Sequence, residues 1–222
     1  MKKTILLSGA MLLTGVALVH GTAAAAALDK VRGLYSTWSI GGYANLNLTR
    51  ADGHILKADN GVTVSTGINV GYEFLPTFNY GNFGVEFSYN YLGGAKYVYT
   101  EANKVSNNMV VQGYHILLPS AHYTFPLPMG FDLRFGAGFG ISMVPIASTV
   151  ILANGKSFTS NETPVVGVFV PSLSANYHYQ LLTTGIGIRY YVPMNGITLK
   201  NGAQFDLVNS GFAFDANVGV RF

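Results

Sequence analysis

Strict alternation of apolar and polar side chains is the strongest pattern in this chain. Over residues 62–74, six of the seven even positions are apolar and none of the six odd positions is. Residues 131–143 and 211–222 repeat this period of two. Successive side chains of a β-strand point to opposite faces, so each segment predicts a strand with one apolar and one polar face.

Five further segments show the same alternation less completely. They cover residues 37–49, 83–92, 109–125, 165–180 and 184–192. Within 109–125 the apolar face changes phase near Pro119, which predicts a β-bulge at this proline. Together with the three clear segments, these predict an all-β fold of eight antiparallel strands.

The connections between the predicted strands alternate in length. Short connections fall near 75–82, 126–130 and 181–183. Long connections fall near 50–61, 93–108, 144–164 and 193–210. Alternation of this kind is typical of an outer-membrane barrel, which has short periplasmic turns, long extracellular loops and an even number of strands. We therefore predict an eight-stranded antiparallel transmembrane β-barrel.

The N-terminus has the features of an export signal. Lys2 and Lys3 precede a mostly apolar stretch over residues 5–19, and a run of alanines over 23–27 offers small-residue cleavage sites. This order predicts a signal peptide over residues 1–27, cleaved near Ala27, followed by a barrel domain over 28–222. An uncleaved anchor is the alternative, but the stretch is short for a membrane span.

Composition decides which face of the strands meets lipid. The chain is 49% hydrophobic and only 10% charged, and the polar faces contain mostly Gly, Ser, Asn and Thr instead of the Lys and Glu of a soluble surface. We therefore expect the apolar faces to point outward into the membrane. Cysteine is absent, which excludes disulfides and thiol chemistry. The positive residues are scattered, so no nucleic-acid partner is expected.

Eight alternating strands behind a signal peptide, ending in FAFDANVGVRF, resemble the small outer-membrane barrels of Gram-negative bacteria, the OmpA/OmpX/OmpW-like proteins. The resemblance covers nearly all of the mature chain and implies a location in the cell outer membrane. It also implies that the terminal Phe222 belongs to a C-terminal signal read by the barrel-assembly machinery. It does not specify an activity.

Seven charged residues fall on faces predicted to line the lumen. They are Glu73, Glu86, Asp132, Arg134, Arg189, Asp215 and Arg221. Glu73 and Glu86 would repel each other on neighbouring strands unless a cation lies between them, and Arg134 is the candidate. Arg189 and Asp215 could pair directly. We expect a structural polar plug, because the interior of an eight-stranded barrel is just wide enough to be filled by side chains. A narrow, charge-selective conduit is the alternative.

Two prolines raise a second functional hypothesis. Pro119 and Pro171 lie inside predicted strands, where proline removes a ladder donor. OmpW-like proteins are associated with passage of small hydrophobic molecules through a lateral opening beside a proline, and the resemblance implies that these residues could have that role. A lumen that is polar and charged would not suit it.

Catalysis is the third hypothesis, since some eight-stranded barrels modify lipid A. His54 with Asp52, and Ser120 with His122, are the local pairs, and no acid is placed beside the second pair by sequence. Single histidines are usually structural, so we expect no enzyme activity. The five histidines show no metal-ligand spacing on one face, so we expect no metal or cofactor.

The sequence therefore predicts a surface-exposed, largely plugged barrel that acts through its extracellular loops in a structural, adhesion or ligand-contact role. The expected partners are outer-membrane lipid and lipopolysaccharide, the barrel-assembly machinery, and a host or small hydrophobic ligand.

Overall fold

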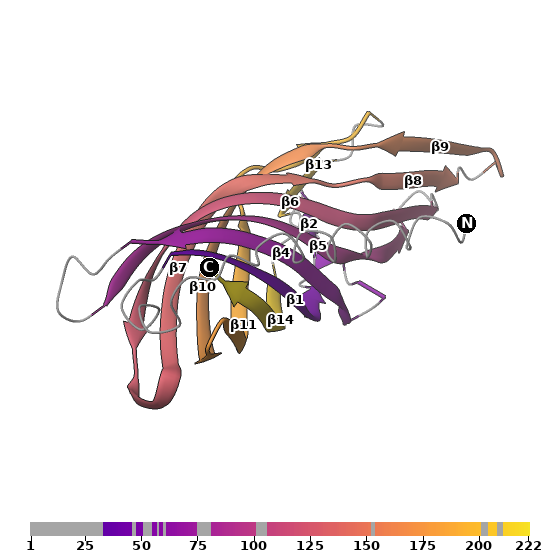
Figure 1. Cartoon of the computed structure of the whole chain (residues 1–222). Coiled ribbons are helices and arrows are strands. Elements are labelled where there is room, and N and C mark those ends of the chain that lie inside the picture. The colour runs from indigo at the N-terminus through magenta and orange to yellow at the C-terminus, as the bar shows by residue number, and fades with distance from the viewer. Residues whose placement is uncertain are drawn as a thin grey trace. The chain divides into compact units, whose positions relative to one another are not determined.

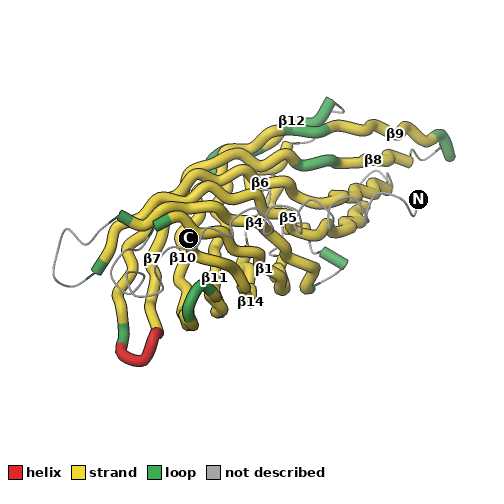
Figure 2. Tube along the Cα trace, viewed as in Figure 1, coloured by secondary structure: helices red, strands yellow, loops and turns green. Residues whose placement is uncertain are grey.

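A computed structural model describes most of the predicted barrel domain (Figures 1 and 2). The described residues are 33–45, 48–50, 55–56, 58–59, 61–74, 81–100, 106–151, 154–200, 204–207 and 211–222. The predicted signal peptide lies outside them. No helix among the described residues is long and apolar enough to cross a membrane.

Eight antiparallel strands form a closed ring. They are β1 (Leu34–Asn45), β4 (Val62–Glu73), β5 (Asn82–Thr100), β6 (Ser106–Pro126), β7 (Phe131–Met143), β10 (Val165–Tyr179), β11 (Leu182–Pro193) and β14 (Gly211–Arg221). Their order is β5-β4-β1-β14-β11-β10-β7-β6, and pairing of β5 with β6 closes the ring. The predicted fold class is confirmed, and β7 has the predicted bounds.

The alternation separates an apolar exterior from the lumen. On β4, the even residues Val64, Ile68 and Val70 are exposed, whereas the odd residues Ser65 and Asn69 are buried. Large aromatic side chains are also among the exposed residues. They include Trp38, Phe74, Phe83, Phe125, Phe131, Tyr179 and Phe222. This arrangement is inverted relative to a soluble barrel, whose apolar side chains would fill the centre.

The connections alternate between the two ends of the ring. We call the end that joins β4 to β5, β6 to β7 and β10 to β11 the short-turn end, and the opposite one the long-loop end. At the short-turn end the β6–β7 connection is a single 3₁₀ turn, Pro128–Gly130, the one helical segment coloured in Figure 2. Met129 there has a φ of 64°, in the left-handed region that L-residues rarely adopt.

At the long-loop end, part of the sheet continues beyond the ring. Strands β5 and β6 are longer than the predicted 83–92 and 109–125. Residues 115–126 of β6 pair with β7, and residues 106–111 pair with β8 (Ile146–Ile151). Strand β9 (Ser157–Glu162) pairs with β8. We call this four-stranded part the extension; Figure 1 shows β8 and β9 following β6 along it.

A second small sheet forms from two other long connections. Its order is β12 (Ile197–Thr198), β13 (Gln204–Leu207), β2 (Leu48–Arg50) and β3 (Ile55–Leu56). Segments predicted as long loops thus contain short strands, because backbone groups that approach the barrel still need hydrogen-bond partners.

The predicted bulge at Pro119 is wrong. From Tyr114 to Thr124, every second residue of β6 is buried except Ser120, which is half-buried, and Pro119 stays on the exposed face. The phase changes instead at Gly113, which has a φ of 156° and is followed directly by a second buried residue, Tyr114. Glycine accommodates this backbone, whereas a proline within a strand can keep the alternation intact.

Candidate functional site in the barrel lumen

Glu73 is the centre of a charged cluster at the short-turn end. Its side chain is fully buried at the last residue of β4. Oε1 accepts hydrogen bonds from Arg134 Nη2 at 2.7 Å and Thr124 Oγ1 at 2.9 Å, and Oε2 accepts one from Arg221 Nη1 at 3.2 Å. His122 Nε2 lies 3.6 Å from Oε1. Three strands, β6, β7 and β14, thus supply partners to one carboxylate.

Arg134 lies between the two glutamates that sequence alone would leave in repulsion. Its Nη1 is 3.6 Å from Glu86 Oε2, while Nη2 contacts Glu73. Tyr35 completes this group, since its hydroxyl donates to Glu86 at 2.8 Å and its ring centroid lies 4.7 Å from the Arg134 guanidinium carbon. A guanidinium over an aromatic face gains cation–π attraction, which helps to offset its burial.

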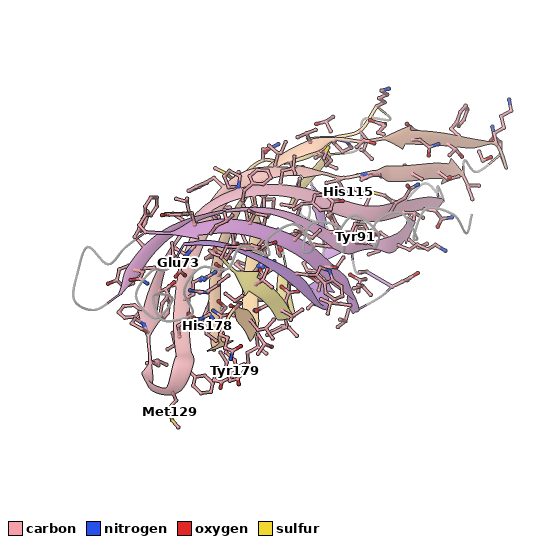
Figure 3. The ribbon with its side chains drawn as sticks, viewed as in Figure 1. Glu73, Tyr91, His115, Met129, His178 and Tyr179 are labelled. Atoms are coloured by element: carbon pink, nitrogen blue, oxygen red, sulfur yellow. The ribbon has the colours of Figure 1, made fainter. Side chains whose placement is uncertain are left out.

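Asp132 forms a second cluster on β7, beside the first. Its oxygens contact His178 Nε2 and accept a hydrogen bond from Asn176 Nδ2 at 2.8 Å. Arg221 Nη2 lies 3.7 Å from Asp132, so Arg221 joins both clusters. In Figure 3, Glu73 and His178 lie toward the same end as Met129, while Tyr91 and His115 lie toward the other.

Arg189 and Asp215 form a third group, closer to the long-loop end of the lumen. Arg189 Nη1 is 3.7 Å from Asp215 Oδ2 and also donates to Asn90 Oδ1. Ser65 Oγ donates to Asp215 Oδ1 at 2.7 Å. The structure thus places all seven predicted charges in the lumen, in ion-pair contacts shorter than 4 Å.

Residues of the Glu73 cluster and of the Arg189 group line one small polar cavity. Its volume is about 60 Å³, and Arg134, Arg189 and Arg221 line it together with serine and asparagine side chains. This is enough room for water. Among the described residues, no group of His, Cys, Asp or Glu could hold a metal ion.

Beyond Arg189 the lumen changes character, which corrects the prediction of a polar interior throughout. The half toward the long-loop end is filled by a buried apolar cluster of strand residues such as Leu92, Ile116 and Val168. The small sheet adds Leu56 and Ile197 to it. The alternation rule fails here because both faces of these strands are apolar: one meets lipid and the other fills the barrel.

Both candidate prolines coincide with gaps in strand pairing. The β6–β7 ladder skips Leu118 and Pro119 between the Ser120 and Leu117 pairs. The β10–β11 ladder skips Val170 and Pro171 in the same way. The register is unchanged across each gap, so these are missing pairs and not bulges. The lost donor of each proline accounts for the gap.

The predicted Ser–His pair faces the lumen without catalytic geometry. Ser120 Oγ donates to the backbone oxygen of Glu86 at 3.3 Å, and His122 lies against Glu73, the acid that sequence did not place there. His122 is 5% exposed and lies among the charges near the short-turn end. The other pair, His54 and Asp52, lies outside the described residues.

Sequence reasoning missed the inward aromatic residues. Tyr35, Tyr43, Tyr114 and Tyr191 are all buried in the lumen. The signal was present for two of them, since Tyr35 and Tyr43 share the odd positions of β1 with Ser39. Residue type alone does not reveal this position, because aromatic residues are also typical of the lipid-facing girdles of such barrels.

Comparisons with known proteins return structural similarity alone. No protein-family model matches the chain, and no curated protein matches it by sequence. Among solved structures it is similar to Neisserial surface protein A, at 16% identity over 86% of this chain and 97% of that chain, with a TM-score of 0.45. It is also similar to OprG of Pseudomonas aeruginosa, at 10% identity over 86% and 97%, with a TM-score of 0.48.

The geometry itself defines the class of protein. A continuous ring of strands leaves no unpaired edge within the barrel, its exterior is apolar, and its charged groups pair with one another inside. Closed rings of this kind satisfy every backbone group in lipid. The chain is a transmembrane β-barrel of eight strands, the architecture of outer-membrane proteins.

Proposed function

We propose that the chain is an exported protein of the outer membrane, with its short-turn end in the periplasm. The order of charge, apolar stretch and alanines over residues 1–27 supports cleavage of a signal peptide. Outer-membrane lipid and lipopolysaccharide then surround the apolar exterior of the barrel. The exposed aromatic side chain of Phe222 is available to the barrel-assembly machinery.

Tag accessibility tests this orientation. A tag inserted at residues 154–156, in the β8–β9 turn, should bind antibody on intact cells, and one at Met129 should bind only after the outer membrane is opened. Met129 is 86% exposed, so its tag should not disturb packing. The reverse pattern would invert the topology and the assignments that follow from it.

The barrel is closed, non-catalytic and active through its extracellular surface. The observation that carries this proposal is the filling of the lumen in two parts. Ion pairs fill the half toward the short-turn end, and an apolar cluster fills the half toward the long-loop end. The extension supplies the working surface, because it continues the sheet beyond the ring and carries exposed side chains such as Phe158, which is 60% exposed.

Two measurements test this role separately. Refolded protein in a planar bilayer should give no stepwise current, and frequent steps would contradict the closed lumen. For the surface, residues 147–161 can be replaced by Asn-Gly, because Ile146 and Glu162 are Cα partners at the base of the β8–β9 hairpin. Cells carrying this variant should lose adhesion to immobilised laminin or fibronectin. Cells carrying Phe158→Ser keep the β8–β9 hairpin and should lose only part of that adhesion.

A second function, lateral passage of small hydrophobic molecules, is supported by three observations. The ladder gaps at Pro119 and Pro171 lie on either side of the β7–β10 pair. Their inward neighbours Leu118 and Val170 belong to the apolar cluster, so the wall is weakest where the lumen is apolar. An exterior groove lined by Val85, Pro119 and other apolar residues lies outside the first gap.

Restoring the missing donors tests this passage. Pro119→Ala and Pro171→Ala each allow an added ladder hydrogen bond and should slow entry of a fluorescent hydrophobic dye into proteoliposomes. Protein-free liposomes give the background rate. If the parent protein takes up dye no faster than that background, the passage does not exist.

A further inference from the structure

The lumen divides into two parts at Arg189 and Asp215. One inward position further toward the long-loop end, β11 carries Tyr191 and β14 carries Ala213, and both are fully buried. The buried carboxylates of the described residues are Glu73, Asp132 and Asp215. None of them lies beyond this level. An ion that moved through the barrel would therefore leave its last charged partner here.

Three tyrosine rings lie across the lumen directly beyond this boundary. The Tyr43 centroid is 6.1 Å from that of Tyr114 and 6.0 Å from that of Tyr191, with interplanar angles of 73° and 88°. Such edge-to-face contacts are the favoured arrangement of aromatic pairs. The rings come from β1, β6 and β11, so they span the ring of strands instead of following one side of it.

Gly211 allows this close arrangement. A Cβ atom at this position would lie 2.6 Å from Tyr43 Cε2, closer than real Cβ atoms come. The backbone of β14 therefore approaches the Tyr43 ring where no side chain could. Each of the three tyrosines is 0% exposed, so no water-sized gap reaches them.

We propose that the layer of Tyr43, Tyr114 and Tyr191 is the barrier to ions in this barrel, and that the charge clusters below it are not. The inference rests on the closed lumen proposed above and locates its seal. Below the layer, the cavity lined by arginine, serine and asparagine side chains is polar and large enough for water. At the layer and beyond it, an ion would lose its water without finding charged groups in exchange, which is prohibitively costly.

Conductance of matched variants tests the seal. In planar bilayers with potassium chloride, Tyr43→Ala/Tyr191→Ala should give stepwise currents where the parent protein gives none. Tyr43→Phe/Tyr191→Phe keeps the rings and should stay closed. Glu73→Gln/Arg134→Gln weakens the lower charge cluster and should also stay closed. Currents from the charge variant alone would overturn the proposal and make the ion pairs the barrier.

Thiol labelling provides a second readout. The chain has no cysteine, so Ser172→Cys places a single thiol on the cavity below the seal. A charged methanethiosulfonate added from the long-loop side should label this thiol in the Tyr→Ala background and not in the parent background. If Tyr43→Ala/Tyr191→Ala is too unstable for planar bilayers, the single variant Tyr191→Ala can be labelled in detergent-free vesicles instead.

The outcomes separate the inference from the function on which it rests. A parent protein that conducts refutes the closed barrel itself. A closed parent protein, with folded tyrosine variants that neither conduct nor label, refutes the tyrosine seal and leaves the closed barrel intact.

Discussion

Glu73→Gln should be the most destabilising isosteric change in the lumen. The substitution keeps the shape of the side chain but removes the negative charge that faces Arg134 at 2.7 Å and Arg221 at 3.2 Å. Both guanidinium groups are largely buried, and the remaining carboxylate contacts, to Glu86 and Asp132, are longer at 3.6 and 3.7 Å. Breaking a buried pair in this way costs about 3–5 kcal/mol, because the unpaired charge stays buried.

Urea unfolding in lipid vesicles measures this cost, with the free energy extrapolated linearly to zero denaturant. Glu86→Gln is the matched control, because Glu86 is partly exposed and its contact with Arg134 is longer. It should lose about 1–2 kcal/mol, the value of one hydrogen bond from Tyr35 and a weak ion pair. Equal losses in the two variants would refute the reasoning, since they would mean that Glu73 is solvated.

Three further outcomes are expected. Val218→Arg, on the lipid face, should cost about 2–4 kcal/mol in vesicle unfolding, whereas the inward neighbour Asn217→Ser should be mild; equal costs would reverse the strand phase. Arg189→Asp with Asp215→Arg should recover part of the stability lost in either single reversal, and a coupling of zero in the double-mutant cycle would mean separately solvated charges. Met129→Asn should raise the unfolding free energy by up to about 1 kcal/mol, because asparagine tolerates the left-handed backbone better; a loss would argue against that conformation.

The strands were predictable because lipid outside and charges inside impose the same two-residue period on most of the barrel. Residues 131–143 show this most clearly, since the strand has the predicted bounds. The extension was not predictable, because its strands continue beyond the ring and contain Asn, Lys and Thr, residues typical of loops. Composition alone does not distinguish a polar strand in water from a loop.

The partners inside the lumen were harder to predict than the strands. Arg189 and Asp215 lie on neighbouring strands, so hairpin topology suggests their approach. Arg221 and Glu73 are separated by 148 positions and meet across the lumen. Their meeting depends on how far the strands are staggered around the ring, a quantity that no local pattern encodes. The tyrosine layer depends on the same stagger.

The position of Arg221 in the last strand has a consequence for how the barrel is completed. Glu73 lies in β4, the second ring strand along the chain, but Arg221, one of its two main cationic partners, lies in β14, the eighth. A partly assembled sheet that lacks β14 therefore cannot neutralise its lumen fully, and water must remain around Glu73 until the seam between β1 and β14 forms. We therefore expect the loss of water from this region to coincide with closure of the seam between β1 and β14.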